Sequence, residues 1–448
     1  MLTTMRNLKN LGLIALLISL YCMAPLALAG GPVIQHWTTD RGLDVHFVRT
    51  DSLPLVDIQL TFDAGSARDG DQPGLARLTS RMLTQGAAGK DAASLARAFE
   101  EQGARYSTTS GRDTASVTLR SLNAPRTLSR SVDNLARMLG KPDFPEDALE
   151  RERRRMLVSL QTSRQDPGSV ANEAFWEALY PDHPYGNPPG GTEHSLSGIS
   201  RADVQAFHQR YYGIANAGLA IVGDISRAEA EQIALHLEQA LPQGQEAEPL
   251  PEVEMPTEAR EIRIEFPSSQ THVLVGQPGY ARGDERHFPL YVGNHILGGG
   301  GLVSRLAIAF REERGLSYSI SSRFTPMVVP GPFRISTQVR SDRTEEALET
   351  IHSLLNELRD EGPAEDELDD AIRHITGSFP LNLDSNSKIT GYVATIGFHG
   401  LPLDYLDTFP ERIREVTGDA VRESLRSAID RDRLVTVIVG PGAEDNGD

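Results

Sequence analysis

Residues 74–82 read Gly-Leu-Ala-Arg-Leu-Thr-Ser-Arg-Met, and the interpretation of the whole chain starts from this stretch. Its apolar residues recur at helical spacing, which predicts a helix over 75–83. Arg77 and Arg81 are four positions apart, so they share one face of that helix. A guanidinium stays protonated and has no lone pair to offer a metal ion. This face therefore carries two fixed positive charges.

Two separated parts of the chain resemble each other. Residues 100–107 (EEQGARYS) match 312–319 (EERGLSYS) at an offset of 212, and each block follows a Leu-Ala-x-Ala-Phe run. The apolar segments 219–224 and 435–440, both strand-like, match at an offset of 217. Such a nearly constant offset indicates an internal duplication.

Composition and charge narrow the class of protein. The chain has 448 residues, of which 39% are hydrophobic and 24% charged, as is typical of a soluble globular protein with more than one domain. The net charge is -18, and no cluster of Lys or Arg stands out. We therefore expect no nucleic acid among its partners.

The first residues are typical of an export signal. Arg6 and Lys9 precede an apolar run over 11–20, and Ala27-Leu28-Ala29 follows it. This order predicts a signal peptide cleaved after Ala29, so residues 1–29 would be removed; an uncleaved membrane anchor is the alternative. Cys22, the only cysteine, lies in this segment, so the mature chain would form no disulfide. Export without disulfides fits a bacterial periplasm.

A stretch rich in Pro and Glu, 243–260, reads as a linker between an N-terminal domain (30–242) and a C-terminal domain (261–448). The N-terminal domain alternates in character: strand patterns at 56–62 and 115–120, helical patterns at 75–83, 95–101 and 145–163. This order predicts an α+β fold, in which each domain has a mainly antiparallel sheet covered by helices.

Four further segments carry a resemblance to a known family. They are Asp63-Ala64-Gly65-Ser66, Asp182–Gly186 with Gly191-Thr192-Glu193, Gly298–Gly301 running into Ser304-Arg305-Leu306, and Arg311–Ser319. With the helix at 75–83, they resemble the M16 (pitrilysin-type) peptidases, in particular bacterial proteins similar to the mitochondrial processing peptidase. The resemblance implies two homologous domains of the LuxS/MPP-like metallohydrolase type.

The same resemblance implies that the zinc site is degenerate. The family's helix reads Gly-Leu-Ala-His-x-x-Glu-His-Met, in which the histidines bind zinc and the glutamate acts as the base. Here Arg77 and Arg81 take the histidine positions and Ser80 takes the glutamate position. The third ligand, a glutamate on a later helix, falls on Ser159, or on Val158 if the register slips by one. None of these side chains is a useful zinc ligand, so the resemblance implies no metal or other cofactor in this chain.

Histidine spacing gives no alternative site, because no two of the 12 histidines fall in His-Glu-x-x-His or His-x-x-Glu-His spacing.

A second functional pair comes from the C-terminal half. In the family, the half without zinc supplies an arginine and, seven residues later, a tyrosine that reach the substrate; here these are Arg311 and Tyr318. The alternative is that Arg311 is a solvated charge and Tyr318 a core strand residue, as Tyr106 would be in the other half. Tyr106 is the repeat mate of Tyr318, but the repeat mate of Arg311 is Phe99. An arginine present only in this half favours a function.

The glycine run before Ser304 contains Gly299, Gly300 and Gly301, which we expect to form a tight turn where backbone approaches a bound peptide. No Gly-Lys-Ser/Thr follows, so the run is not a phosphate-binding loop.

The resemblance thus implies the zinc-less subunit of a heterodimeric M16 peptidase, inactive alone. Its partner would be a homologous subunit with His-x-x-Glu-His and zinc, or a second copy of this chain when that partner is absent. A peptide substrate would add as a strand to a sheet edge. The alternative is a pseudo-peptidase that serves only as a scaffold or peptide-binding protein.

Overall fold

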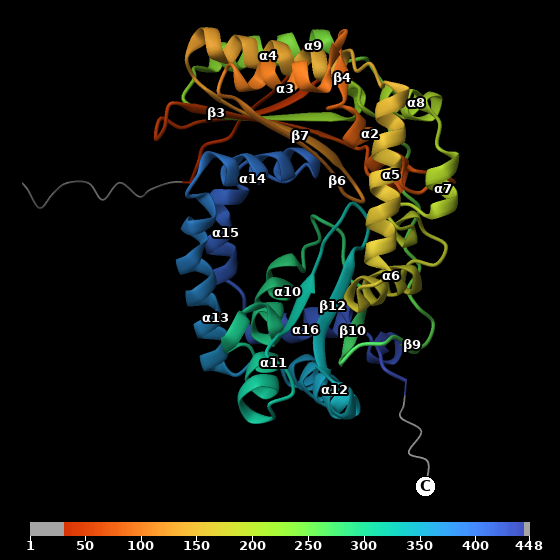
Figure 1. The fold of residues 1–448 in the computed structure, drawn as a ribbon. Helices are drawn as coiled ribbons and strands as arrows, with labels where there is room; N and C mark the ends of the chain where they lie inside the picture. Colours follow the sequence, from red (N-terminus) through yellow and green to blue (C-terminus); the bar gives the residue numbers. More distant parts are fainter. Residues whose placement is uncertain (1–30, 443–448) are drawn as a thin grey trace, which may run out of the picture.

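The computed structural model describes residues 31–442, which form two similar halves, each built around a β-sheet (Figure 1). The predicted signal peptide, with Cys22, lies outside the described residues. The first sheet contains β1 (Gln35–Thr38), β2 (Asp44–Arg49), β3 (Leu55–Phe62), β6 (Arg105–Ser110), β7 (Ala115–Leu122) and β8 (Ala217–Gly223). The second contains β9 (Arg260–Glu265), β10 (Gln270–Pro278), β11 (Ile320–Phe324), β12 (Pro332–Arg340) and β13 (Val435–Gly440). A short ribbon joins β4 (Gly86–Ala87) and β5 (Lys90–Asp91).

The two sheets share one strand order. The first runs β1-β2-β8-β3-β7-β6, and the second, read from its other edge, runs β9-β13-β10-β12-β11. In each sheet the last strand in sequence pairs parallel with the first repeat strand and antiparallel with the second. This equivalence confirms the duplication and the mainly antiparallel α+β fold. Within residues 31–442, β1 alone has no counterpart in the second sheet.

Helices cover both sheets. The N-terminal half contains α2 (Leu75–Met82), α3 (Ala92–Glu100), α4 (Pro125–Gly140), α5 (Glu146–Ser163), α6 (Pro167–Leu179), α7 (Glu193–Gly198), α8 (Arg201–Tyr211) and α9 (Arg227–Ala240). The C-terminal half contains α10 (His287–Asn294), the π-helical turns η4 (His295–Gly299) and η6 (Ile308–Glu313), α11 (Arg305–Ala307), α12 (Thr344–Glu361), α13 (Glu365–Ser378), α14 (Asn386–Phe398), α15 (Tyr405–Arg414) and α16 (Gly418–Ala428). The helices and strands predicted in the N-terminal half are all present. No helix within residues 31–442 is long and apolar enough to cross a membrane.

Each half contributes one helix that packs on the sheet of the other half. The third helix after β7 is α6, and the third after β12 is α14, so the two occupy equivalent places in the chain. Figure 1 shows α14 beneath the N-terminal sheet and α6 beside β10 and β12. The apolar contacts agree: Val48 and Val222 of the first sheet pack in one cluster with Val393 of α14. Phe175 of α6 packs with Val437 of β13. This exchange buries apolar surface from both halves together and fixes them to each other.

The connection between the halves is held along its length. Residues 243–259 have neither helix nor strand. The Gln245 amide donates to the carbonyl oxygen of Arg210, and the Ala247 amide donates to the side-chain oxygen of Asn216. Leu250 packs beside the α6 cluster. The Pro/Glu-rich stretch is thus an extended strap on the protein surface.

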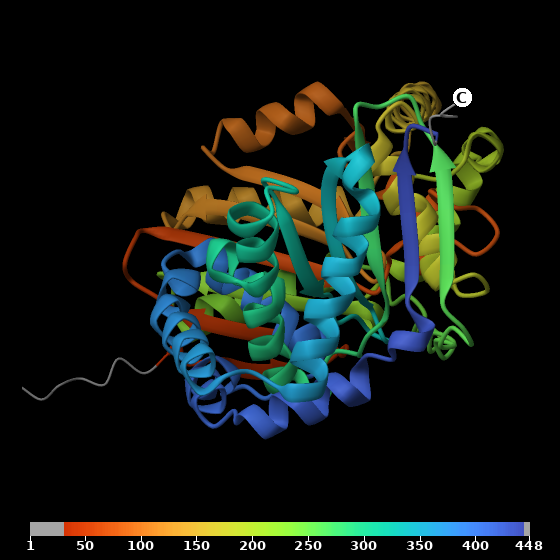
Figure 2. The ribbon, with the colours of Figure 1, turned by 90° about the horizontal axis from the view of Figure 1, so that it is seen from below.

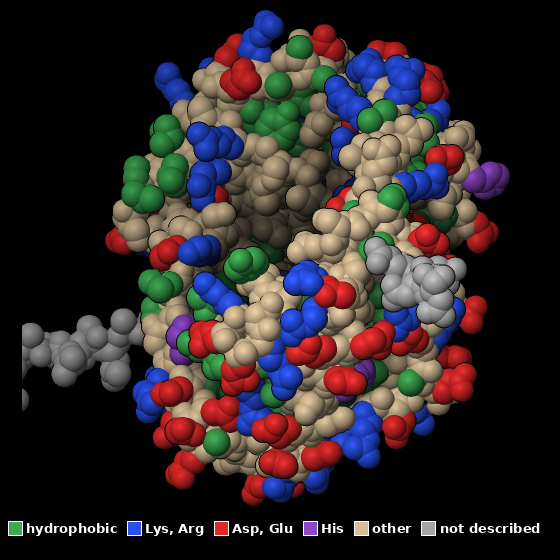
Figure 3. All heavy atoms as spheres, turned by 60° about the horizontal axis from the view of Figure 1, so that its bottom comes forward, with side chains coloured by type: hydrophobic (Ala, Val, Ile, Leu, Met, Phe, Trp, Pro, Cys, Tyr) green, Lys and Arg blue, Asp and Glu red, His purple; other side chains and the backbone are tan. Residues whose placement is uncertain are grey.

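The outer helices leave a hollow between the halves. Seen from below, α12 lies along the outside of the C-terminal sheet (Figure 2). In the space-filling view the molecule is hollowed between its halves, and the wall of the hollow is mostly backbone and uncharged polar side chains (Figure 3).

Candidate functional site

Helix α2, which carries Arg77 and Arg81, begins at a buried cap. Gly74 precedes α2 in the left-handed region, at a φ of 97°. The Asp69 carboxyl accepts hydrogen bonds of 2.7 Å from the amides of Gly74 and Ala76. Burial raises the pKa of Asp69 to about 7, while these two donors oppose the rise. The cap fixes the first turn of α2 and therefore the direction in which its side chains point.

Arg77 and Arg81 both lie on the exposed face of α2, as their spacing predicts. Ser80, by contrast, is buried, with 3% of its surface exposed. Ser159 on α5 is exposed, and Val158 beside it is 61% exposed.

A buried carboxylate that sequence reasoning missed faces Arg81. Glu152 of α5 is only 3% exposed in its side chain, and its Oε2 accepts from Nε of Arg81 at 3.0 Å. Its Oε1 accepts from Arg155 at 2.5 Å. Removing a carboxylate from water is costly unless a cation neutralises it, and two guanidiniums do so here. Glu152 stands seven residues before Ser159, two helical turns away on the same face, which was the available signal.

The donor set at this place does not fit zinc. Arg77, Ser80, Arg81 and Ser159 supply no imidazole, thiolate or carboxylate, which are the groups that bind zinc in proteins. Glu152, the carboxylate that faces Arg81, is already neutralised by two arginines. No step of peptide hydrolysis runs through a metal held between these helices.

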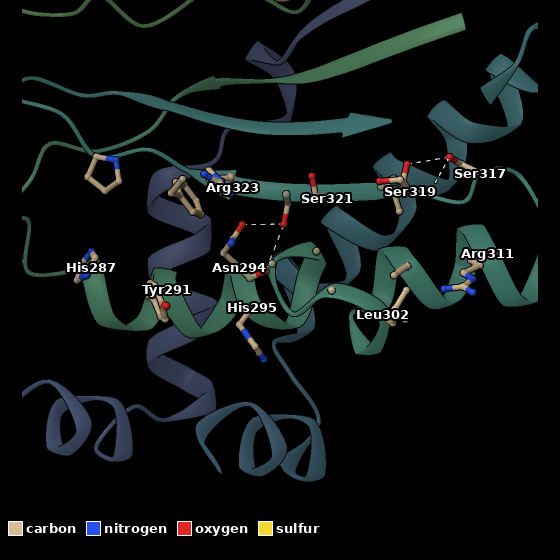
Figure 4. Close-up of a pocket in the computed structure, with 18 of the residues that line it drawn as sticks. His287, Tyr291, Asn294, His295, Leu302, Arg311, Ser317, Ser319, Ser321 and Arg323 are labelled. Carbon is tan, nitrogen blue, oxygen red and sulfur yellow. Dashed lines mark hydrogen bonds between the residues drawn. The ribbon is translucent and has the colours of Figure 1, made fainter. Parts of the chain in front are cut away.

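A cavity of about 610 Å³ lies in the C-terminal half, between β11 and the segment from α10 to η6. Figure 4 shows His287 and Tyr291 toward one end of it and Leu302 and Arg311 toward the other. Its lining includes Asn294, Gly299, Gly301, Arg311, Tyr318 and most of β11.

The predicted pair Arg311 and Tyr318 meets at this cavity. Arg311 is exposed on η6, and Tyr318 is 93% exposed in the loop before β11. The alternative that Tyr318 is a core strand residue is therefore wrong. Neighbouring Arg314 lies 3.8 Å from Glu346, whereas Arg311 has no carboxylate within ion-pair distance among residues 31–442.

The repeat mates of this pair behave differently. Phe99 is completely buried, and the Tyr106 ring packs against it with ring centroids 4.2 Å apart. The backbone around them is nevertheless repeated, because Gly103 and Gly315 hold equivalent left-handed conformations, at φ values of 61° and 59°. The same turn thus carries a packed aromatic pair in one half and an exposed Arg–Tyr pair in the other.

The glycine run is more helical than predicted. Gly299 ends the π-helical turn η4, so the tight turn starts only at Gly300. A Cβ on Gly298 would lie 2.6 Å from the Ser322 amide nitrogen, and one on Gly299 would lie 2.5 Å from Nδ2 of Asn294. These contacts explain the glycines by close packing inside the chain. Gly299 and Gly301 line the cavity, but Gly300 does not.

The cavity is cationic in an acidic protein. Its lining contains Arg282, Arg311 and Arg323 and, among the described residues, no Asp or Glu. Burial lowers the pKa of both His287 and His295 to about 4, so both imidazoles are neutral at neutral pH. The arginines therefore give this cavity a net positive charge that suits a carboxylate or a polarised carbonyl.

Comparisons with known proteins agree with this geometry. Residues 45–193 match the model of insulinase (peptidase family M16), and residues 198–375 match that of the peptidase M16 inactive domain. A non-peptidase homolog, YmxG of Helicobacter pylori, is 24% identical, over 88% of this chain and 90% of its own. An uncharacterized zinc protease of Streptomyces coelicolor is 26% identical, over 70% of this chain and 69% of its own.

Solved structures show the same fold. A crystal structure of a peptidase M16 inactive domain from Pseudomonas fluorescens is 38% identical, has a TM-score of 0.89 and covers 92% of this chain and 98% of its own. A protease from Helicobacter pylori, at 19% identity, has a TM-score of 0.85 over 92% of this chain and 100% of its own, which supports the fold alone. The chain belongs to the M16 peptidase family, as a member that lacks the catalytic motif.

Proposed function

We propose that this chain is the zinc-less subunit of a heterodimeric M16 peptidase in the bacterial periplasm. Its partner is a homologous subunit that carries His-x-x-Glu-His and zinc. The partner supplies the metal, the activated water and the base. This chain supplies Arg311 and Tyr318 to the substrate.

One observation carries the proposal: Arg311 and Tyr318 are both exposed at one cavity, whereas in the repeat Phe99 is buried and the half-buried Tyr106 packs against it. Packing explains the aromatic pair, because the Tyr106 ring packs on the buried Phe99 ring and aromatic side chains stabilise a core. It does not explain the exposed pair, since Tyr318 is 93% exposed and contributes little burial. Neither side chain is buried in the core, so both can contact a ligand.

The two side chains suit separate tasks. The planar guanidinium of Arg311 can hold a peptide carbonyl or carboxylate through two parallel hydrogen bonds. The Tyr318 hydroxyl can donate a hydrogen bond to the oxyanion that forms as water attacks the peptide carbonyl. A donor of this kind typically contributes about 10²–10³ in kcat.

The positive charge of the cavity indicates which class of peptide would bind there. Arg282 and Arg323 line it together with Arg311, with no Asp or Glu among the described residues around it. Peptides with acidic side chains or a terminal carboxylate would be attracted to it. Their association rate would fall as the salt concentration rises, because salt screens the attraction. We therefore propose peptides with acidic residues near the bond that is cleaved.

The test is reconstitution. The purified chain is mixed with a zinc-bearing M16 homologue from the same organism, and cleavage of a fluorogenic acidic peptide is measured. Tyr318→Phe removes only the hydroxyl, and we expect it to lower kcat about 10²-fold with the complex intact by size-exclusion chromatography. Arg311→Ala should raise KM as well, because it removes a contact to the bound substrate.

Arg314→Ala is the matched control, since Arg314 is a neighbouring exposed arginine that does not line the cavity. Its activity should equal that of the unmodified chain. If Arg311→Ala and Tyr318→Phe also leave kcat and KM unchanged in an active complex, the chain is a scaffold, and the proposed catalytic contribution is refuted.

A further inference from the structure

We propose that His36, Asp44 and His46 form a binding site for a divalent transition-metal ion of the zinc class, remote from the degenerate site on α2. The three side chains belong to the hairpin of β1 and β2. Their candidate ligand atoms all lie within 4.8 Å of one another. This site is independent of the proposed function, since it uses none of the residues at the cavity.

Strand geometry brings the three groups together. His36 on β1 stands directly opposite His46 on β2 in the antiparallel register. Asp44 is two residues before His46, so both side chains project from the same face of the strand. The two imidazole rings are 4.7 Å apart between centroids, and the Asp44 carboxylate reaches both rings.

The distances are close to those a bound ion requires. Zinc lies about 2.1 Å from imidazole nitrogen and carboxylate oxygen, so two tetrahedral ligands are about 3.4 Å apart. His46 Nδ1 is 3.5 Å from Asp44 Oδ2. His36 Nε2 is 2.5 Å from Asp44 Oδ1, so His36 must withdraw by about 1 Å. Its side chain is 38% exposed, which leaves room for that movement.

The chemistry of the donor set fits the same class of ion. Two imidazoles and a carboxylate suit zinc, iron, nickel and copper, and discriminate against calcium and magnesium, which prefer oxygen ligands. Three protein ligands leave a fourth position for water.

Helix α14 packs closely over His46, which is 6% exposed. α14 packs on this face of the sheet, and a Cβ on its Gly397 would lie 2.8 Å from Nδ1 of His46. Only glycine at position 397 therefore avoids crowding that nitrogen. Arg227 lies on the other face of the hairpin, where it stacks on Trp37, 3.6 Å from the ring centroid.

The position suggests what the ion would do. β1 is the strand that the C-terminal sheet lacks, and it pairs with β2 alone. An edge strand of four residues has few hydrogen bonds of its own. A metal joining His36 to Asp44 and His46 would tie β1 to the sheet. The role we assign to the ion is thus structural.

Metal binding tests the proposal directly. The purified chain is stripped with a chelator, dialysed and titrated with Zn²⁺ by calorimetry, with Co²⁺ as a spectroscopic probe. We expect about one equivalent bound, a raised thermal midpoint and a Co²⁺ spectrum typical of nitrogen and oxygen ligands. His36→Gln and Asp44→Asn should each weaken the affinity at least 10-fold. Gly397→Ala should also weaken it, although alanine is the better helix former.

His236→Gln is the matched control. His236 lies 2.8 Å from Asp133 and is also exposed, but only two donors meet there, so its loss should leave the affinity unchanged. The proposal is overturned if the stripped chain binds no Zn²⁺, or if His36→Gln and Asp44→Asn bind it as tightly as the unmodified chain. Zinc that persists in both variants and is lost in Glu152→Gln would place the ion between α2 and α5 and would likewise overturn it.

Discussion

Replacing Arg81 by alanine tests whether this arginine neutralises a buried charge. The change removes the 3.0 Å contact between Nε of Arg81 and Oε2 of Glu152. Glu152 has only 3% of its side chain exposed, so water cannot fully replace the lost donor. Losing a hydrogen bond to a buried charged group costs about 1.5–3 kcal/mol in free energy of unfolding.

Two features of the structure reduce that cost. The Arg81 side chain is 45% exposed, so solvent screens part of the attraction, and Arg155 still holds the other oxygen of Glu152. We therefore expect Arg81→Ala to lower the free energy of unfolding by about 1–2 kcal/mol. The thermal midpoint, followed by calorimetry, should fall by roughly 2–4 °C.

Arg77→Ala is the matched control, because it removes an exposed arginine from the same face of the same helix. Arg77 makes no ion pair among residues 31–442, so this change should stay within about 0.5 kcal/mol. Adding Glu152→Gln to Arg81→Ala should recover part of the loss, since no buried charge then needs neutralising. Equal effects of Arg81→Ala and Arg77→Ala would show that the Arg81–Glu152 pair contributes nothing to stability.

Two further predictions concern stability. Burial lowers the pKa of His208 to about 4, so between about pH 6.5 and 4 only the unfolded chain takes up this proton, and stability falls as the pH drops. The loss from this residue is about 2 kcal/mol at pH 5, and His208→Gln should flatten the dependence of the thermal midpoint on pH; an unchanged slope would contradict the lowered pKa. Phe99→Ala should cost about 3–5 kcal/mol, but Tyr318→Ala less than about 0.5. Chemical denaturation measures both, and comparable losses would refute the difference between the repeats.

Local pattern predicted several elements of this fold, most of them in the N-terminal half. The 75–83 helix follows from apolar spacing, and β3 and β7 follow from alternation. The duplication was visible as two blocks 212 residues apart, and the shared strand order bears it out. The exchange of α6 and α14 was not predictable, because helical periodicity shows that a face is apolar but not which sheet covers it.

Some residues of the candidate sites could likewise be predicted from the sequence, and others could not. Positions that align with a motif, such as Arg77 and Arg311, were found from sequence. Glu152 was missed because its partner Arg81 is 71 residues away in the chain. The cluster of His36, Asp44 and His46 has no helical spacing that a sequence motif could show, because strand pairing brings these residues together.

The duplication itself explains why the two halves can differ so sharply at one position. In the N-terminal half, Phe99 is completely buried with the half-buried Tyr106 packed against it, and burying the Phe99 ring stabilises the fold by about 1.5–3 kcal/mol. In the C-terminal half, Phe310, one residue before Arg311, is completely buried and belongs to the core. The π-helical turn η6 ends the helix with a different register, so the residue after Phe310 projects outward. The side chain at position 311 therefore does not pack in the core. An arginine there lowers the stability of the fold little and can contact a ligand.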